Sequence, residues 1–151
     1  MKNTSINWIS NGINCFLIRD PLEVIHSYIQ KNNLDSFLDI GFPNQFNIFQ
    51  EVKSLNKEII VINAKDLLQS PKKILKKLCN KLKISFDEKM LKWPKGPRKT
   101  DGIWSSIWYE SVQCSTGFNK YIKKKISIPL KHQNIYEECL NIYQIMNNYK
   151  I

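Results

Sequence analysis

Four residues have the types and positions needed to bind an anion together. The chain holds two arginines, Arg19 and Arg98, and otherwise draws its positive charge from lysine. Arg19 follows a short apolar run, and Ser27 lies eight residues further on. Arg98 is followed directly by Lys99 in the segment 94–102, which is rich in proline and glycine. A planar guanidinium fork, an ammonium group and a hydroxyl are donors that hold phosphate, so these residues are the candidate anion site.

The segment 15–27 predicts a strand, a tight turn and a helix. Its run from Cys15 to Ile18 is apolar, Asp20 suits the N-cap, and Pro21 suits the first helical position. Glu23 stands where a capping box places its acid. In open α/β sheets, anionic ligands bind beyond the carboxyl end of a strand, at the N-terminus of the following helix. The sequence therefore predicts an anion site at this turn.

A second strand is predicted over residues 58–62, which are continuously apolar and β-branched after Glu58. Residues 63–68 are expected to form a short turn, and Ser70 with Pro71 is expected to open another helix. Further helices are predicted over 21–31, 43–55, 104–118 and 129–149. Two strands that are each followed by a helix favour an α/β fold with a small parallel sheet flanked by helices and a helical C-terminal part.

Length and composition favour one domain over residues 1–151. The chain has 151 residues, of which 42% are hydrophobic, so it can bury a real core. No apolar run reaches the roughly 18 residues of a membrane span, and residues 1–7 lack the apolar centre of a signal peptide. The four cysteines lie far apart and form no CxxC pair. We therefore expect buried, reduced thiols in a cytoplasmic protein, and no metal site.

The net charge of +10 is compatible with several anionic partners: nucleic acid, a membrane surface, or a ligand that carries phosphate or sulfate. The lysines of residues 72–83 have the spacing of a solvated helix face, and no aromatic residue alternates with them. Nucleic acid is therefore disfavoured. A non-catalytic basic module that binds a nucleotide or nucleic acid remains the alternative interpretation.

Three segments resemble the sulfotransferase family in their order and rough spacing: residues 16–27, 62–71 and 96–104. In that family, an arginine at a strand end and a serine eight residues later bind a 3′-phosphate. A strand followed by an Asp-Leu stretch and a proline comes next, and a basic, glycine-bearing loop then closes over the same phosphate. The resemblance covers residues from about 15 to 118.

The resemblance implies a partial P-loop NTPase-like three-layer fold that binds 3′-phosphoadenosine 5′-phosphosulfate (PAPS) without a metal. The implied reaction transfers a sulfuryl group to a hydroxyl or amine of a small-molecule or glycan acceptor. Arg19 and Ser27 would bind the 3′-phosphate of the nucleotide, and Arg98 with Lys99 would bind it through a second loop. The acceptor itself is not identified by these segments.

The chain also departs from the family pattern, which makes the resemblance one to the C-terminal part of such a domain. No residues match the loop that binds the 5′-phosphosulfate, and neither His26 nor His132 stands where the family has its catalytic base. Thr100 occupies the place of a glycine after the Arg-Lys pair. No catalytic residue is therefore assigned.

Three accounts fit these departures. The chain is a truncated or split gene product, it completes its site with a second chain, or it binds without catalysing. A parallel sheet without its first strand would expose an apolar edge, which predicts self-association.

Overall fold

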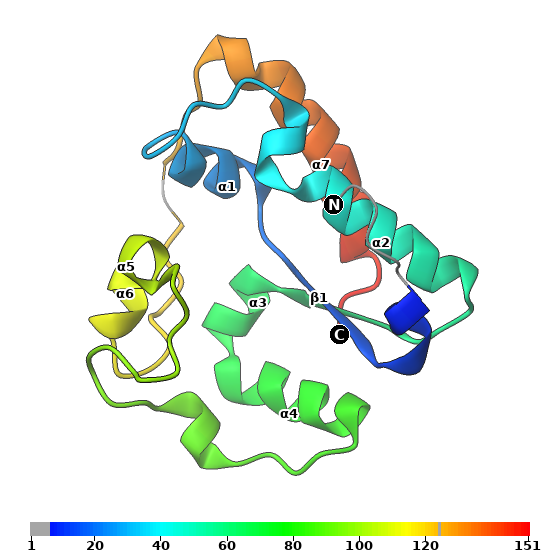
Figure 1. The fold of residues 1–151 in the computed structure, drawn as a ribbon, viewed down its shortest axis with the longest axis vertical. Coiled ribbons are helices and arrows are strands. Elements are labelled where there is room, and N and C mark those ends of the chain that lie inside the picture. The colour runs from blue at the N-terminus through cyan, green and yellow to red at the C-terminus, as the bar shows by residue number, and fades with distance from the viewer. Residues whose placement is uncertain (1–6, 124) are drawn as a thin grey trace. The chain divides into compact units, whose positions relative to one another are not determined.

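A computed structural model describes residues 7–123 and 125–151 and divides the chain into two compact units. The strand unit comprises Met1–Lys65 and Lys123–Ile151, and the loop unit comprises Asp66–Ile122. Figure 1 shows the course of the chain, with the N-terminal and C-terminal segments both in the strand unit. A single domain over residues 1–151 stays a prediction.

The strand unit is built on two parallel strands, β1 (Asn14–Ile18) and β2 (Ile59–Asn63). They pair in register from Asn14 opposite Ile59 to Ile18 opposite Asn63. The backbone N–H of Ile151 donates to the carbonyl of Val61 at 3.1 Å, so the last residues of the chain also lie along β2. Four of the five β2 residues are buried, as the continuous apolar run predicts.

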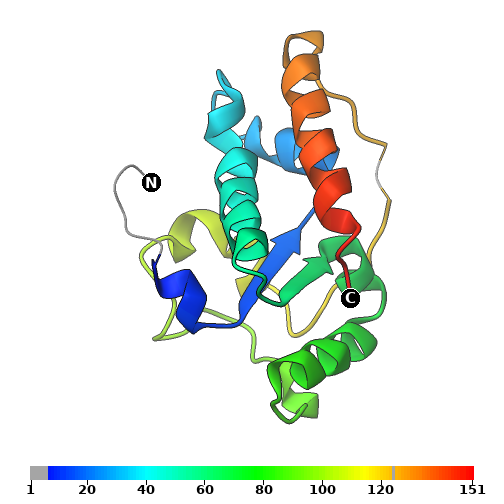
Figure 2. The same ribbon diagram turned by 90° about the vertical axis from the view of Figure 1, so that its right-hand side faces the viewer.

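Three helices belong to the same unit as this sheet: α1 (Pro21–Tyr28), α2 (Phe42–Ser54) and α7 (Gln133–Asn147). Helices α2 and α7 run beside each other and contact both strands (Figure 2). Short 3₁₀ turns occupy Asn7–Asn11, Phe37–Ile40 and Leu130–His132. The α/β class with a small parallel sheet is therefore confirmed.

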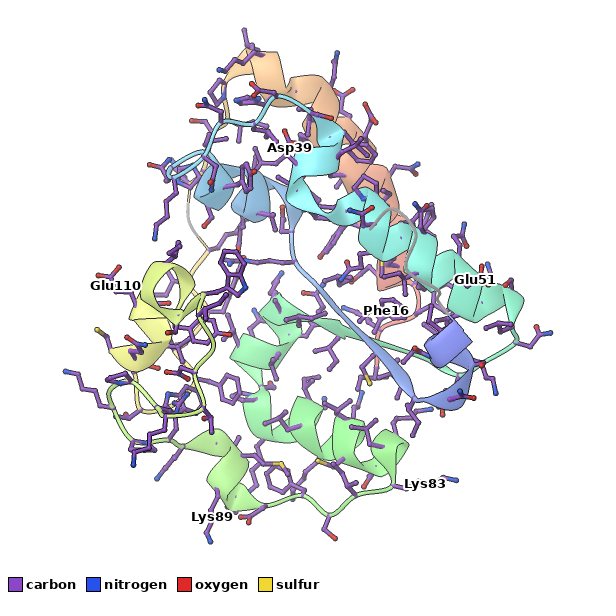
Figure 3. All side chains as sticks on the ribbon, viewed as in Figure 1. Phe16, Asp39, Glu51, Lys83, Lys89 and Glu110 are labelled. Carbon is purple, nitrogen blue, oxygen red and sulfur yellow. The ribbon has the colours of Figure 1, made fainter. Side chains whose placement is uncertain are left out.

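The core of the strand unit centres on Phe49, which is fully buried. Its ring lies edge-on to the rings of Phe16 and Tyr149, at centroid distances of 5.7 and 5.1 Å. Figure 3 labels Phe16, a residue of β1 that belongs to this core. Met146 of α7 and Val61 of β2 join the same cluster. Apolar residues that are far apart in sequence thus fix the sheet against α2 and α7.

The loop unit contains α4 (Pro71–Leu82), a 3₁₀ turn at Glu88–Leu91, and the short helices α5 (Ser105–Trp108) and α6 (Glu110–Gln113). Ile74 and Cys79 are the buried residues of α4, and its lysines are exposed. Lys72 pairs with Glu88, and the ammonium of Lys76 lies 5.5 Å from the ring centroid of Phe86. Two of these lysines thus have partners within their own unit, as expected for a solvated helix face.

Two sequence expectations about local structure are wrong. Residues expected to form a turn instead form α3 (Ala64–Gln69), because the side chain of Asn63 accepts a hydrogen bond from the backbone N–H of Lys65 at 2.9 Å and supports the helix start. The predicted helix 104–118 is broken into α5 and α6. The backbone N–H of Gly96 donates to the carbonyl of Gln113 at 2.8 Å. Gly96 lies outside the predicted helix, so the helical pattern of residues 104–118 does not include this bond.

Candidate anion-binding site

The turn after β1 places Arg19 at the carboxyl end of the strand and at the start of α1. Buried Ile18 closes the strand, and buried Pro21 and Ile25 fix the helix behind the turn. The side-chain amide of Gln45 in α2 donates to the carbonyl of Leu17 at 3.1 Å, which adds a polar contact just before the turn. Arg19 therefore projects from a backbone held on both sides.

The N-terminus of α1 is capped by the chain's own carboxylate. Asp20 Oδ1 accepts from the N–H of Leu22 at 2.9 Å, and Pro21 has no N–H to offer. The N-cap that the sequence predicts is thus confirmed. Because this cap uses the backbone N–H of Leu22, an anion at the turn would be bound mainly by side chains. The sequence alone predicts binding at the helix N-terminus.

Arg19, Glu23 and Ser27 are spaced by four residues; Glu23 and Ser27 share one face of α1, and Arg19 lies just before the N-cap Asp20. The Nε of Arg19 donates to Oε2 of Glu23 at 2.8 Å, and Nη2 lies at the same distance from the same oxygen. The Arg19 side chain is 53% exposed, whereas that of Glu23 is 15% exposed. Ser27 is exposed. Of the two predicted phosphate ligands, Arg19 thus lies before α1 and Ser27 on it, with the Glu23 carboxylate between them in sequence and in contact with Arg19.

The polar contact of Arg19 with Glu23 uses one edge of the guanidinium. The Nε–H and the nearer N–H of Nη2 point to the same side, toward Glu23 Oε2. The N–H groups at the far end of the guanidinium, on Nη1 and Nη2, form a second fork that suits two phosphate oxygens. Arg19 can therefore bind an anion end-on.

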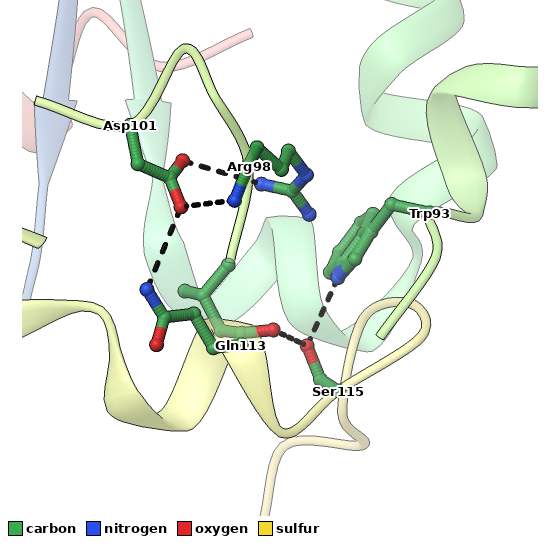
Figure 4. Close-up of polar contacts among 6 residues, drawn as sticks. Trp93, Arg98, Asp101, Gln113 and Ser115 are labelled. Carbon is green, nitrogen blue, oxygen red and sulfur yellow. Dashed lines mark hydrogen bonds and ion pairs between the residues drawn. The ribbon is translucent and has the colours of Figure 1, made fainter. Parts of the chain in front are cut away.

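In the loop unit, Arg98 lies in a turn organised by Asp101 (Figure 4). Asp101 Oδ2 accepts from the backbone N–H of Arg98 at 2.9 Å, and the N–H of Asp101 donates to the carbonyl of Arg98 at 3.0 Å. The other carboxylate oxygen lies 4.0 Å from Nη1 of Arg98. Gln113 reaches Asp101 Oδ2 at 3.5 Å, and Lys99 is exposed. Asp101 therefore holds both the turn and its arginine.

A shallow hollow of about 680 Å³ lies beside this turn, lined by residues 91–94 and 116–118. Trp93 donates from Nε1 to Oγ of Ser115 at 3.1 Å, and its ring packs edge-on to Phe118 at 5.3 Å. Figure 4 shows Trp93 and Ser115 joined in this way. The hollow is open and of mixed polarity, and it contains none of the four predicted site residues.

Arg19 and Ser27 belong to the strand unit, and Arg98 and Lys99 belong to the loop unit. That all four bind one ligand stays a prediction. Sequence reasoning missed the roles of Glu23 and Asp101. The sequence did offer a signal for both roles, because Glu23 follows Arg19 by four residues and Asp101 follows Arg98 by three. Such spacings bring opposite charges together.

The cysteines differ from the expectation that all four are buried. Cys79 and Cys139 are buried, whereas Cys15 and Cys114 are exposed, because the side chain of Cys15 lies on the exposed face of β1 and the end of α6 leaves Cys114 uncovered. Burial, with a smaller contribution from the charge of Glu138, raises the pKa of the Cys139 thiol to about 12.

Within residues 7–123 and 125–151, no group of three or more metal-ligating side chains comes together. His132 is buried and His26 is half-buried. Across the same residues, no helix has both the length and the apolar character to span a bilayer.

Residues 1–149 match the sulfotransferase domain family. Two curated relatives come from Arabidopsis thaliana. Branched-chain-amino-acid aminotransferase-like protein 2 is 35% identical over 138 residues, which are 91% of this chain and 24% of that protein. Branched-chain-amino-acid aminotransferase-like protein 1 is 36% identical over 141 residues, 93% of this chain and 25% of that protein. This chain thus spans about a quarter of the length of the two relatives. No solved structure matches it.

Proposed function

Because the chain belongs to the sulfotransferase domain family, we propose that it binds 3′-phosphoadenosine 5′-phosphosulfate and takes part in sulfuryl transfer to a hydroxyl or amine. The observation that carries this proposal is the position of Arg19 at the carboxyl end of the parallel strand β1, with Glu23 and Ser27 on the helix that follows. The proposal concerns this chain alone. The names of the two plant relatives describe proteins about four times as long as this chain.

The residues of the β1–α1 turn fit a nucleotide phosphate. The end-on fork of Arg19 offers two parallel N–H groups, and the exposed hydroxyl of Ser27 on α1 offers one further donor. A terminal phosphate carries between one and two negative charges at neutral pH, which a guanidinium matches better than an ammonium. We therefore assign Arg19 and Ser27 to the 3′-phosphate of the nucleotide.

Arg98 and Lys99 are proposed to bind the same phosphate, on the strength of the sequence resemblance. Asp101 fixes the backbone of the turn around Arg98, and the Arg98 side chain is 35% exposed. This arrangement supports the proposed role. When bound, PAPS would supply an activated sulfuryl group. The residues assigned here would bind and orient the nucleotide, and none of them is proposed as the catalytic base.

Calorimetric titration with 3′-phosphoadenosine 5′-phosphate tests the proposal without requiring an acceptor. We expect micromolar-scale binding by the wild-type protein and loss of binding in Arg19→Ala. Lys57→Ala removes the same charge from an exposed position of the strand unit and should leave binding nearly unchanged. Absence of binding at millimolar nucleotide would exclude the proposed ligand.

The alternative of a basic nucleic-acid module is tested in the same preparation. Such a module would bind generic DNA or RNA with an affinity that falls steeply with salt, because phosphate contacts release counterions. We expect that no binding to a mixed-sequence oligonucleotide persists at physiological salt. Strong, salt-dependent binding in Arg19→Ala as well as in the wild type would favour the alternative.

A further inference from the structure

The carboxylate of Glu23 occupies the side-on fork of Arg19, next to the end-on fork where an anion would bind. Both Nε and Nη2 of Arg19 lie 2.8 Å from Oε2 of Glu23. Glu23 follows Arg19 by four residues and precedes Ser27 by four. Glu23 and Ser27 both belong to α1, where positions four apart lie about 6 Å from each other, and the Arg19 guanidinium is in direct contact with Glu23. An anion that accepts from both Arg19 and Ser27 must therefore lie close to the Glu23 carboxylate.

Arg19 and Glu23 differ in burial, and this difference assigns a role to each residue of the ion pair. Glu23 is 15% exposed and is fixed on α1, whereas Arg19 is 53% exposed and precedes the helix. The guanidinium can thus turn toward solvent on its flexible stem, while the acid stays in place. We propose that Glu23 acts as an internal counter-anion of Arg19 that lowers the affinity of the site for phosphate. This inference rests on the proposed function and names the residue that sets its affinity.

Two opposing effects of Glu23 can be compared by their size. The ion pair orients Arg19, but an exposed pair at this spacing contributes only weakly to order. Against this, a phosphate of nearly two charges about 6 Å from a carboxylate is repelled by an amount that corresponds to about a tenfold loss of affinity, even with the dielectric constant of water. Repulsion therefore outweighs orientation, and neutralising Glu23 is expected to tighten binding.

The test compares charge-neutral and charge-retaining variants by titration with 3′-phosphoadenosine 5′-phosphate at low salt. Glu23→Gln keeps an amide oxygen for Arg19 and removes the charge, and about a tenfold decrease in Kd is expected. Glu23→Asp keeps the charge on a shorter side chain, and its Kd should stay within about threefold of wild type. Glu51→Gln makes the same change of net charge on α2 and serves as the control.

The outcomes separate the inference from the proposed function. Tighter binding by Glu23→Gln, with Glu51→Gln unchanged, supports the counter-anion. Equal or weaker binding by Glu23→Gln, with clear binding by the wild type, overturns the inference and assigns Glu23 to positioning Arg19 instead. If neither protein binds the nucleotide, the proposed function fails and the inference fails with it. Far-UV circular dichroism and thermal melts of each variant confirm that the compared proteins are folded.

Discussion

Asn63 offers the sharpest test of how the fold holds the β1–α1 turn. It lies at the end of β2, is 5% exposed, and pairs in register with Ile18, the residue before Arg19. Its Nδ2 donates to the hydroxyl of Tyr143 and to Oδ1 of Asn147, both at 2.8 Å. Its Oδ1 accepts from the N–H of Lys65 at 2.9 Å. One buried side chain thus joins β2, α3 and α7.

Replacement of Asn63 by alanine removes all three hydrogen bonds. A hydrogen bond of this kind contributes about 1 kcal/mol net, and the groups left unpaired in a buried place add to the cost. We therefore expect Asn63→Ala to lower the free energy of unfolding by about 3 kcal/mol. Tyr143→Phe removes one acceptor and should cost about 1 kcal/mol.

Urea unfolding followed by circular dichroism measures these differences. Asn141→Ala, at an exposed position of α7, is the matched control and should change stability by no more than about 0.5 kcal/mol. The double variant at positions 63 and 143 should be little worse than Asn63→Ala alone, because both changes break the same bond. Additive effects, or a cost below about 1 kcal/mol for Asn63→Ala, would refute the proposed network.

Three further predictions concern other parts of the molecule. Phe49→Ala should lower the free energy of unfolding by about 3–5 kcal/mol, measured by urea titration, because its ring fills the centre of the core. Gly117→Ala should lower Tm because an added Cβ would lie 3.0 Å from a backbone carbonyl, whereas Gly12→Ala, with nothing within 4 Å, should not. Cys139, whose pKa is raised to about 12, should resist iodoacetamide in the native protein while exposed Cys114 reacts; equal labelling on mass spectrometry would contradict its burial.

The strand, turn and helix of the candidate site were predictable because their determinants are local. An apolar run ends before Arg19, Asp20 supplies the cap, and Pro21 fixes the first helical residue. These features act within a few residues of one another, so the sequence alone placed the turn. The β2 strand was equally clear from its continuous β-branched residues.

The features that the sequence did not reveal depend on distant partners. Asn63 supports the start of α3, but its own partners stand 80 and 84 residues away on α7. The break between α5 and α6 accompanies a bond from Gly96 to Gln113. Helical periodicity describes one element at a time and carries no information about such contacts.

The pairing of Glu23 with Arg19 was a different kind of omission. Its spacing was visible, yet the position of Glu23 in the first turn of α1 favoured a capping role. The structure shows its carboxylate 2.8 Å from Nε and Nη2 of the guanidinium.

The energy that the 3′-phosphate contributes to binding tests the central claim most directly. Titration of the wild type and of Arg19→Ala with 3′-phosphoadenosine 5′-phosphate, and with adenosine 5′-phosphate, which lacks the 3′-phosphate, measures that energy in each protein. We expect the wild type to prefer the first nucleotide by roughly 1.5–3 kcal/mol, the range for hydrogen bonds to charged groups, and Arg19→Ala to lose most of the preference. An equal preference in both proteins would show that Arg19 does not bind the 3′-phosphate.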